Sequence, residues 1–141
     1  MAYVGIPIAG GLHITLVHIE IPKDAERKND WEIGVNTAIS DLLARARSEG
    51  RTFPTATWGR AEMMGRYRNV KAILIDSPGI RGLRAGLVSE LARINVPISE
   101  TFGPGYVPHV TKAPLQVIGG EVRLEQWIEF VSKPNTWSHE L

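Results

Sequence analysis

The sequence of 141 residues contains no cysteine. This absence excludes a disulfide framework, a thiolate nucleophile and thiolate-bound zinc or iron–sulfur centres. The chain also has little net charge, because 16 basic residues balance 15 acidic ones and leave a formal charge of +1. It therefore lacks the overall positive field that holds long duplex nucleic acid without regard to sequence. Any contact with nucleic acid must be local.

Charged residues are absent from positions 1–19, a stretch long enough to suggest a membrane span or a signal peptide. Glycine and proline interrupt the stretch, it contains two histidines, and no basic residues precede it. These features fit neither a membrane span nor a signal peptide. We expect a cytoplasmic protein without a membrane partner. Its length and ordinary composition predict one domain over residues 1–141, and we expect it to act as a monomer.

The hydrophobic pattern predicts an α+β fold. Strands are expected at residues 3–8, 12–19, 53–58, 70–76 and around 107–113, with a hairpin joining the third and fourth. Helices are expected from Asn29 or Asp30 to about Gly50, and from Ser77 to before Pro97. The last apolar segment, residues 122–131, fits either element, and we favour a strand. The tail from Pro134 is expected to be irregular.

Two tripeptides of the same pattern stand 96 positions apart, His13-Ile14-Thr15 and His109-Val110-Thr111. Side chains alternate between the faces of a strand, so each histidine shares a face with the threonine two positions later. With an ordinary pKa near 6.5, one imidazole can accept a proton while another donates one. A threonine hydroxyl can donate a hydrogen bond to a phosphate oxygen. The pair predicts acid and base catalysis at a phosphodiester.

The other two histidines are expected to be incidental, because alternation puts His18 on the face opposite His13, and His139 lies in the tail. Spacing typical of a histidine metal site is missing, so we expect neither a metal nor a cofactor.

Aromatic and basic residues near loops are weaker candidates. Trp58, Tyr106 and Phe102 can stack on a base, although ordinary packing is the commoner role for each. Arg66 belongs to a basic stretch that can contact phosphate, although a solvated hairpin face is the commoner explanation. We include Trp58, Tyr106 and Arg66 as candidate substrate-binding residues beside Thr15 and Thr111.

The segments His13-Ile14-Thr15-Leu16 and Pro108-His109-Val110-Thr111 resemble the paired HxT signatures of the two-histidine (2H) phosphoesterases. This family includes RNA ligase-like proteins and cyclic nucleotide phosphodiesterases, and the order of elements resembles its plan over most of the chain. The resemblance implies two pseudo-symmetric lobes of antiparallel sheet, with helices outside and the motifs facing across a central cleft. It also implies catalysis without a metal. Lys112 departs from the family pattern, which usually has an aliphatic residue there.

The residues and the resemblance together predict hydrolysis of a phosphodiester in a 2',3'-cyclic nucleotide, an RNA end or a small cyclic nucleotide. His13 and His109 are the expected catalytic pair, and the sequence leaves open which is the acid. One alternative is a phosphodiesterase that degrades cyclic oligonucleotide signals, as some viral members do. Another is a nucleotide- or RNA-binding module on the same fold, without turnover. A nucleotide or RNA-end substrate is the expected partner, rather than a long duplex.

Overall fold

The computed structural model describes residues 2–65, 67–99 and 105–141. Two helices and eight strands follow one another within these ranges, and they confirm the α+β class. The helices are α1 (Ala25–Ser48) and α2 (Pro78–Arg93). The strands are β1 (Ala2–Ile8), β2 (Leu12–Ile19), β3 (Thr57–Met64), β4 (Val70–Asp76), β5 (Ile98–Ser99), β6 (His109–Thr111), β7 (Trp127–Ser132) and β8 (Asn135–Glu140).

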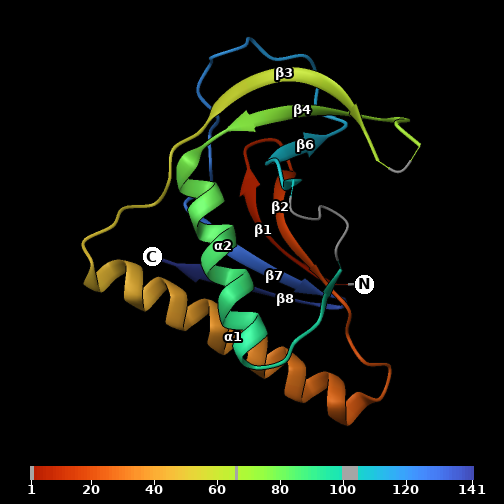
Figure 1. The fold of residues 1–141 in the computed structure, drawn as a ribbon, viewed down its shortest axis with the longest axis vertical. Coiled ribbons are helices and arrows are strands. Elements are labelled where there is room, and N and C mark those ends of the chain that lie inside the picture. The colour runs from red at the N-terminus through yellow and green to blue at the C-terminus, as the bar shows by residue number, and fades with distance from the viewer. Residues whose placement is uncertain (1, 66, 100–104) are drawn as a thin grey trace.

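The strands form two antiparallel sheets. The larger sheet has the order β5-β2-β1-β7-β8, and the smaller has the order β3-β4-β6. Figure 1 shows the smaller sheet at the top of the molecule, above the ends of β1 and β2, with α1 at the bottom and α2 in front. The first HxT tripeptide lies on β2 and the second on β6, so the two motifs belong to different sheets.

The main core lies between the helices and one face of the larger sheet. Helix α1 contacts β7 and β8, and α2 contacts β2 and α1. Fully buried apolar side chains fill the space between these layers, among them Ile6, Ile14, Ile39, Leu87 and Phe130. Side chains on the opposite face of β1, β2 and β7 are half-buried in an alternating pattern. The polar groups of the larger sheet therefore gather on the face away from the helices.

The start of α1 was wrongly placed by the sequence, whereas the start of α2 was correct. Helix α1 begins at Ala25, because the carboxylate of Asp24 accepts hydrogen bonds from the backbone N–H groups of Glu26 and Arg27. This first turn is polar, so no apolar periodicity announces it. The hydroxyl of Ser77 accepts a bond from the N–H of Ile80 and caps α2, as expected.

Two strand assignments need correction. The third strand begins at Thr57 rather than Phe53 and runs through part of the basic stretch, although the expected hairpin with β4 is confirmed. The strand preferred for residues 122–131 is confirmed from Trp127 onward, where β7 begins, whereas residues 122–126 are not part of a strand. The tail, however, is not irregular, since it forms β8 and pairs with β7. Trp137 stacks on Phe130 with ring centroids 5.2 Å apart, a contact that sequence alternation alone did not reveal.

Candidate active site

His13 and Thr15 lie on the face of β2 that points away from the helices. In the ladder with β1, His13 pairs with Pro7 and Thr15 pairs with Gly5. Both side chains are half-buried, whereas Ile14 between them is fully buried against the core. The alternation predicted from the sequence is confirmed for this tripeptide.

The ring of His13 is held by an aromatic partner above a glycine. Tyr3 stacks on His13 with ring centroids 4.4 Å apart and planes inclined by 14°. A Cβ atom added to Gly5 would lie 3.4 Å from the Tyr3 ring, 3.5 Å from the His13 ring and 2.7 Å from the carbonyl oxygen of Ile14. The missing side chain at Gly5 therefore leaves the space in which the two rings meet.

Tyr3 is itself fixed by the next strand. Its hydroxyl donates a hydrogen bond to Oε1 of Glu129 on β7, at 3.3 Å. Burial, followed by the nearby Glu129 carboxylate, raises the pKa of Tyr3 to about 12. Sequence analysis did not assign Tyr3 or Gly5 to the site. The available signal was a glycine inside an otherwise apolar strand, which often marks a close approach of other groups.

His109 and Thr111 lie on the same face of β6, at the edge of the smaller sheet. They pair with Leu74 and Ala72 of β4. The Nδ1 atom of His109 lies 2.9 Å from the carbonyl oxygen of Val107. A carbonyl can only accept a hydrogen bond, so Nδ1 carries the proton of the neutral ring.

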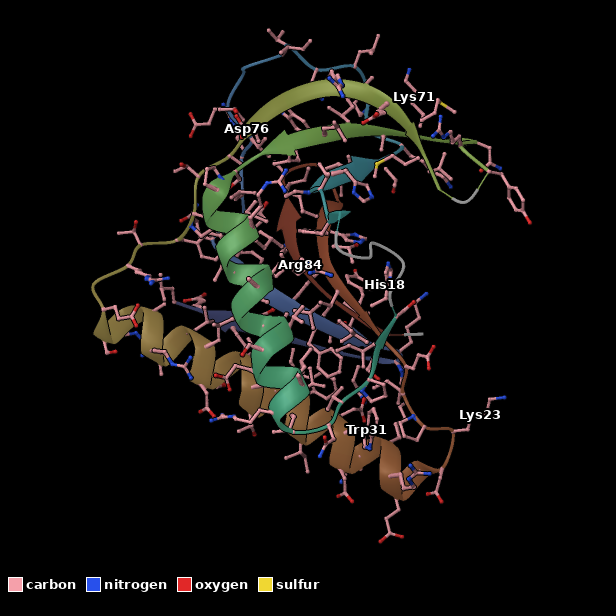
Figure 2. The ribbon with its side chains drawn as sticks, in the orientation of Figure 1. His18, Lys23, Trp31, Lys71, Asp76 and Arg84 are labelled. Atoms are coloured by element: carbon pink, nitrogen blue, oxygen red, sulfur yellow. The ribbon has the colours of Figure 1, made fainter. Side chains whose placement is uncertain are left out.

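Tyr106 joins the two motifs. Its hydroxyl donates a hydrogen bond of 2.8 Å to the backbone oxygen of Thr15, and Arg81 Nη1 donates a bond of 3.0 Å to the Tyr106 carbonyl. The guanidinium carbon of Arg84 lies 4.4 Å from the centre of the Tyr106 ring, and Figure 2 shows Arg84 extending from α2 toward β2. Burial raises the pKa of Tyr106. These contacts hold the segment before β6 against β2, and the two strands lie in contact.

A β-bulge interrupts the ladder between β1 and β2. Gly5 pairs with Thr15, but its neighbour Val4 pairs with Val17 rather than with Leu16. Leu16 is thus an extra residue on β2, and both Leu16 and Val17 are buried. An extra residue of this kind reverses the alternation of every side chain beyond it.

The expectation that His18 faces away from His13 is therefore wrong. His18 pairs with Tyr3, and Tyr3 shares a face with Gly5, the partner of Thr15. Side chains of paired residues lie on the same face of a sheet, so His13, Thr15 and His18 share one face. Two consecutive buried residues at the middle of the strand are the trace of the bulge, but an apolar pair in a sequence does not identify one.

The histidines differ in their electrostatic surroundings. Burial lowers the pKa of His13 below its ordinary value of 6.5. The pKa of His18 is lowered first by burial and then by the positive charges that His13, His109 and the N-terminus carry when protonated. Both catalytic candidates are therefore within electrostatic reach of His18. His139 lies elsewhere, on β8, where its Nε2 donates to Oδ1 of Asn36 at 2.7 Å.

Of the remaining candidate residues, only Trp58 lies within the described ranges. Trp58 is in the core, with 9% of its surface exposed, so it offers no open ring to a base. Arg66 and Phe102 lie outside the described residues. A groove of about 400 Å³ lies between α1, α2 and residues 51–54, and its lining residues come from neither β2 nor β6. It is separate from the paired motifs.

Two findings bear on metals and membranes. Within residues 2–65, 67–99 and 105–141, no group of three or more histidine, aspartate or glutamate side chains is placed to hold a metal ion. Neither helix in these ranges is long and apolar enough to cross a membrane.

Comparison with known proteins gives a likeness of fold. No protein-family profile matches the sequence, and no curated protein matches it. Among solved structures, the PDE domain of MHV ns2 is similar with a TM-score of 0.51 and 13% sequence identity. The alignment covers 96% of this chain and 77% of that chain. At this identity the likeness establishes the fold, and the function must be argued from the site.

Proposed function

We propose that the chain is a phosphoesterase that hydrolyses a phosphodiester in a 2',3'-cyclic nucleotide, an RNA end or a small cyclic nucleotide, without a metal ion. One observation carries the proposal: β2 and β6 lie in contact, each with a histidine and a threonine on one face. Two imidazoles and two hydroxyls supply the proton carriers and phosphate contacts that displacement at phosphorus requires. The fold shared with a PDE (phosphodiesterase) domain supports the same reaction class.

His13 is the proposed general base. Burial lowers its pKa, which favours the neutral imidazole near pH 7. The neutral ring accepts a proton from the attacking water while the water oxygen forms a bond to phosphorus. The stack with Tyr3 fixes the plane of the ring, so its nitrogens keep one direction.

His109 is the proposed general acid. Its Nδ1–H is bound to the Val107 carbonyl, so in the protonated ring the proton on Nε2 is the one that passes to the leaving group. As the bond between phosphorus and the leaving ribose oxygen breaks, Nε2 donates its proton to that oxygen. The hydroxyls of Thr15 and Thr111 donate hydrogen bonds to the non-bridging phosphate oxygens. Proton exchange with water then restores both rings.

The decisive experiment is a substrate panel read by chromatography of the products. It contains 2',3'-cyclic mononucleotides, RNA with a 2',3'-cyclic end, 2'-5'-linked oligoadenylate, cyclic di- and trinucleotides, and duplex DNA. We expect turnover of at least one of the first four classes and none of duplex DNA, because the near-zero net charge gives no general hold on a polymer. His139→Ala is the matched histidine control.

The same panel decides between hydrolysis and the alternatives. Tight binding of one class without product would point to a nucleotide- or RNA-binding module. Preference for cyclic or 2'-5'-linked oligonucleotides would favour degradation of nucleotide signals. Activity should persist in excess EDTA, and restoration of a chelated, inactive protein by a divalent ion would contradict the metal-free mechanism.

A further inference from the structure

Thr15 occupies the middle of the polar face of β2. His13 lies two residues before it, and His18 follows after the bulge at the next position of the same face. The partners of the three residues on β1 are Pro7, Gly5 and Tyr3, which are evenly spaced. With a rise of about 3.3 Å per residue, each imidazole is attached roughly 6 to 7 Å from Thr15 along the strand. A phosphate bound at Thr15 thus has a histidine on either side.

We propose that His18 is a third histidine of the candidate active site, where it donates a hydrogen bond to the phosphate on the side of Thr15 opposite His13. The proposal rests on the proposed function in that it takes the polar face of β2 as the phosphate site. Figure 2 shows His18 on β2, near the end of the strand that pairs with β5.

The bulge is the structural reason for this placement. In a regular strand, His18 would join Ile14 on the face that packs against the helices. The extra residue Leu16 turns His18 to the face of His13 and Thr15, and it keeps Leu16 and Val17 in the core. Bulges commonly redirect one side chain next to an active site. The bulge disrupts the hydrogen-bond ladder at Leu16, and this disruption is what places His18 at the proposed phosphate site.

The electrostatics agree with a neutral His18 that binds phosphate through a hydrogen bond. Burial and the charges of His13 and His109 lower the pKa of His18, which favours a neutral ring at pH 7. A neutral imidazole has one N–H donor and one acceptor. Its N–H can donate to a phosphate oxygen without adding a third positive charge beside two imidazoles that must exchange protons.

The binding test uses inorganic phosphate and does not depend on turnover. The chain has four histidines, so single substitutions suffice to assign the imidazole ¹H–¹⁵N signals. During a phosphate titration at pH 7, we expect the signals of His13, His18 and His109 to shift with one common Kd. His139 is bound to Asn36 and lies on β8, at the edge of the larger sheet opposite β5. Its signals should therefore not shift.

Each outcome separates this inference from the proposed function. Shifts at His13 and His109 with none at His18 would overturn the role of His18 and leave the hydrolysis proposal intact. Shifts at all three without turnover of any substrate would support His18 as a phosphate ligand and reject hydrolysis. Equal shifts at His139, or no shifts at all, would overturn the inference.

Kinetics then distinguish a substrate contact from a structural role. We expect His18→Ala to raise KM about 10-fold while kcat changes less than about 3-fold, because one hydrogen bond to bound phosphate is lost and both proton carriers remain. His18→Gln keeps an N–H donor and should recover most of the KM. A loss of kcat in both variants, or no change in KM in either, would contradict a phosphate-binding His18.

Discussion

The two HxT motifs are nearly identical in sequence but are held in different ways. His13 lies on a strand inside the larger sheet, where Tyr3 stacks on its ring above Gly5. His109 lies on the edge strand of the smaller sheet, where a backbone carbonyl accepts its Nδ1–H. Burial lowers the pKa of His13, whereas a hydrogen bond fixes the tautomer of His109. Sequence symmetry therefore does not imply equal roles, and this asymmetry can be tested.

The largest effect should follow removal of either imidazole that we propose to be catalytic. We expect His13→Ala and His109→Ala each to lower kcat by at least about 100-fold, because each removes one proton transfer. Circular dichroism and thermal unfolding should show the fold retained, with His139→Ala as the control. If one of the two variants kept wild-type turnover, the paired mechanism would be wrong.

A methyl group at Gly5 should disturb the β2 motif and spare the β6 motif. The new Cβ would lie 2.7 Å from the Ile14 carbonyl, a distance that backbone atoms must move to relieve. We expect Gly5→Ala to lower the free energy of unfolding by about 1 to 3 kcal/mol and to reduce turnover. Denaturant unfolding measures the first effect, and the substrate panel the second.

A glycine in open space provides the matched control. A Cβ at Gly82 on α2 meets no atom within 4 Å, and the residue is exposed. Gly82→Ala should raise stability by about 0.5 to 1 kcal/mol through helix propensity, without affecting the site. Equal effects of the two substitutions would refute a special role for Gly5.

Thr15→Val and Thr111→Val sharpen the comparison at the two proposed phosphate contacts. Each change deletes one hydroxyl and keeps the shape, so we expect a fall in kcat/KM of about 10-fold, smaller than that for a histidine. Thr15 is flanked by two histidines, whereas the exposed Thr111 ends its strand. The Thr15 variant should therefore weaken phosphate binding more, which the NMR titration can measure.

The sequence predicted what depends on local patterns. Period-two alternation placed His13 with Thr15, and the cap at Ser77 placed the start of α2. Prediction from the sequence failed where a residue distant in the chain decides the conformation. The bulge at Leu16 depends on pairing with β1, and strand β8 depends on Trp137 packing against Phe130.

The candidate site was likewise predicted only where it depends on local sequence. The two motifs were recognised from their residues, but Tyr3, Gly5 and His18 join them only through cross-strand contacts. The role of Tyr106 in tying the segment before β6 to Thr15 likewise depends on a residue 91 positions away. Such contacts have no signature in one sequence.

The pH dependence tests the assignment of His13 as the base. Because burial lowers its pKa below 6.5, the folded protein binds this proton less readily than the unfolded chain. Activity should rise with pH along a limb whose midpoint lies below pH 6.5. The free energy of unfolding should fall as the pH drops below 6.5, because the unfolded chain then binds the proton more readily. An acidic limb centred above 6.5 would exclude His13 as a base of lowered pKa.

The smallest effect should come from the hydroxyl that fixes the aromatic partner of His13. Tyr3→Phe removes the hydrogen bond to Glu129 but keeps the ring stacked on His13, so we expect kcat to fall by less than about 3-fold. Tyr3→Leu removes the stack as well, and it should lower kcat further by letting the imidazole rotate away from the attacking water. His109, held by its own backbone bond, should keep its NMR signals in both variants. If Tyr3→Leu left turnover and the His13 signals unchanged, the stack would be a packing contact only, and the difference between the two motifs would rest on burial alone.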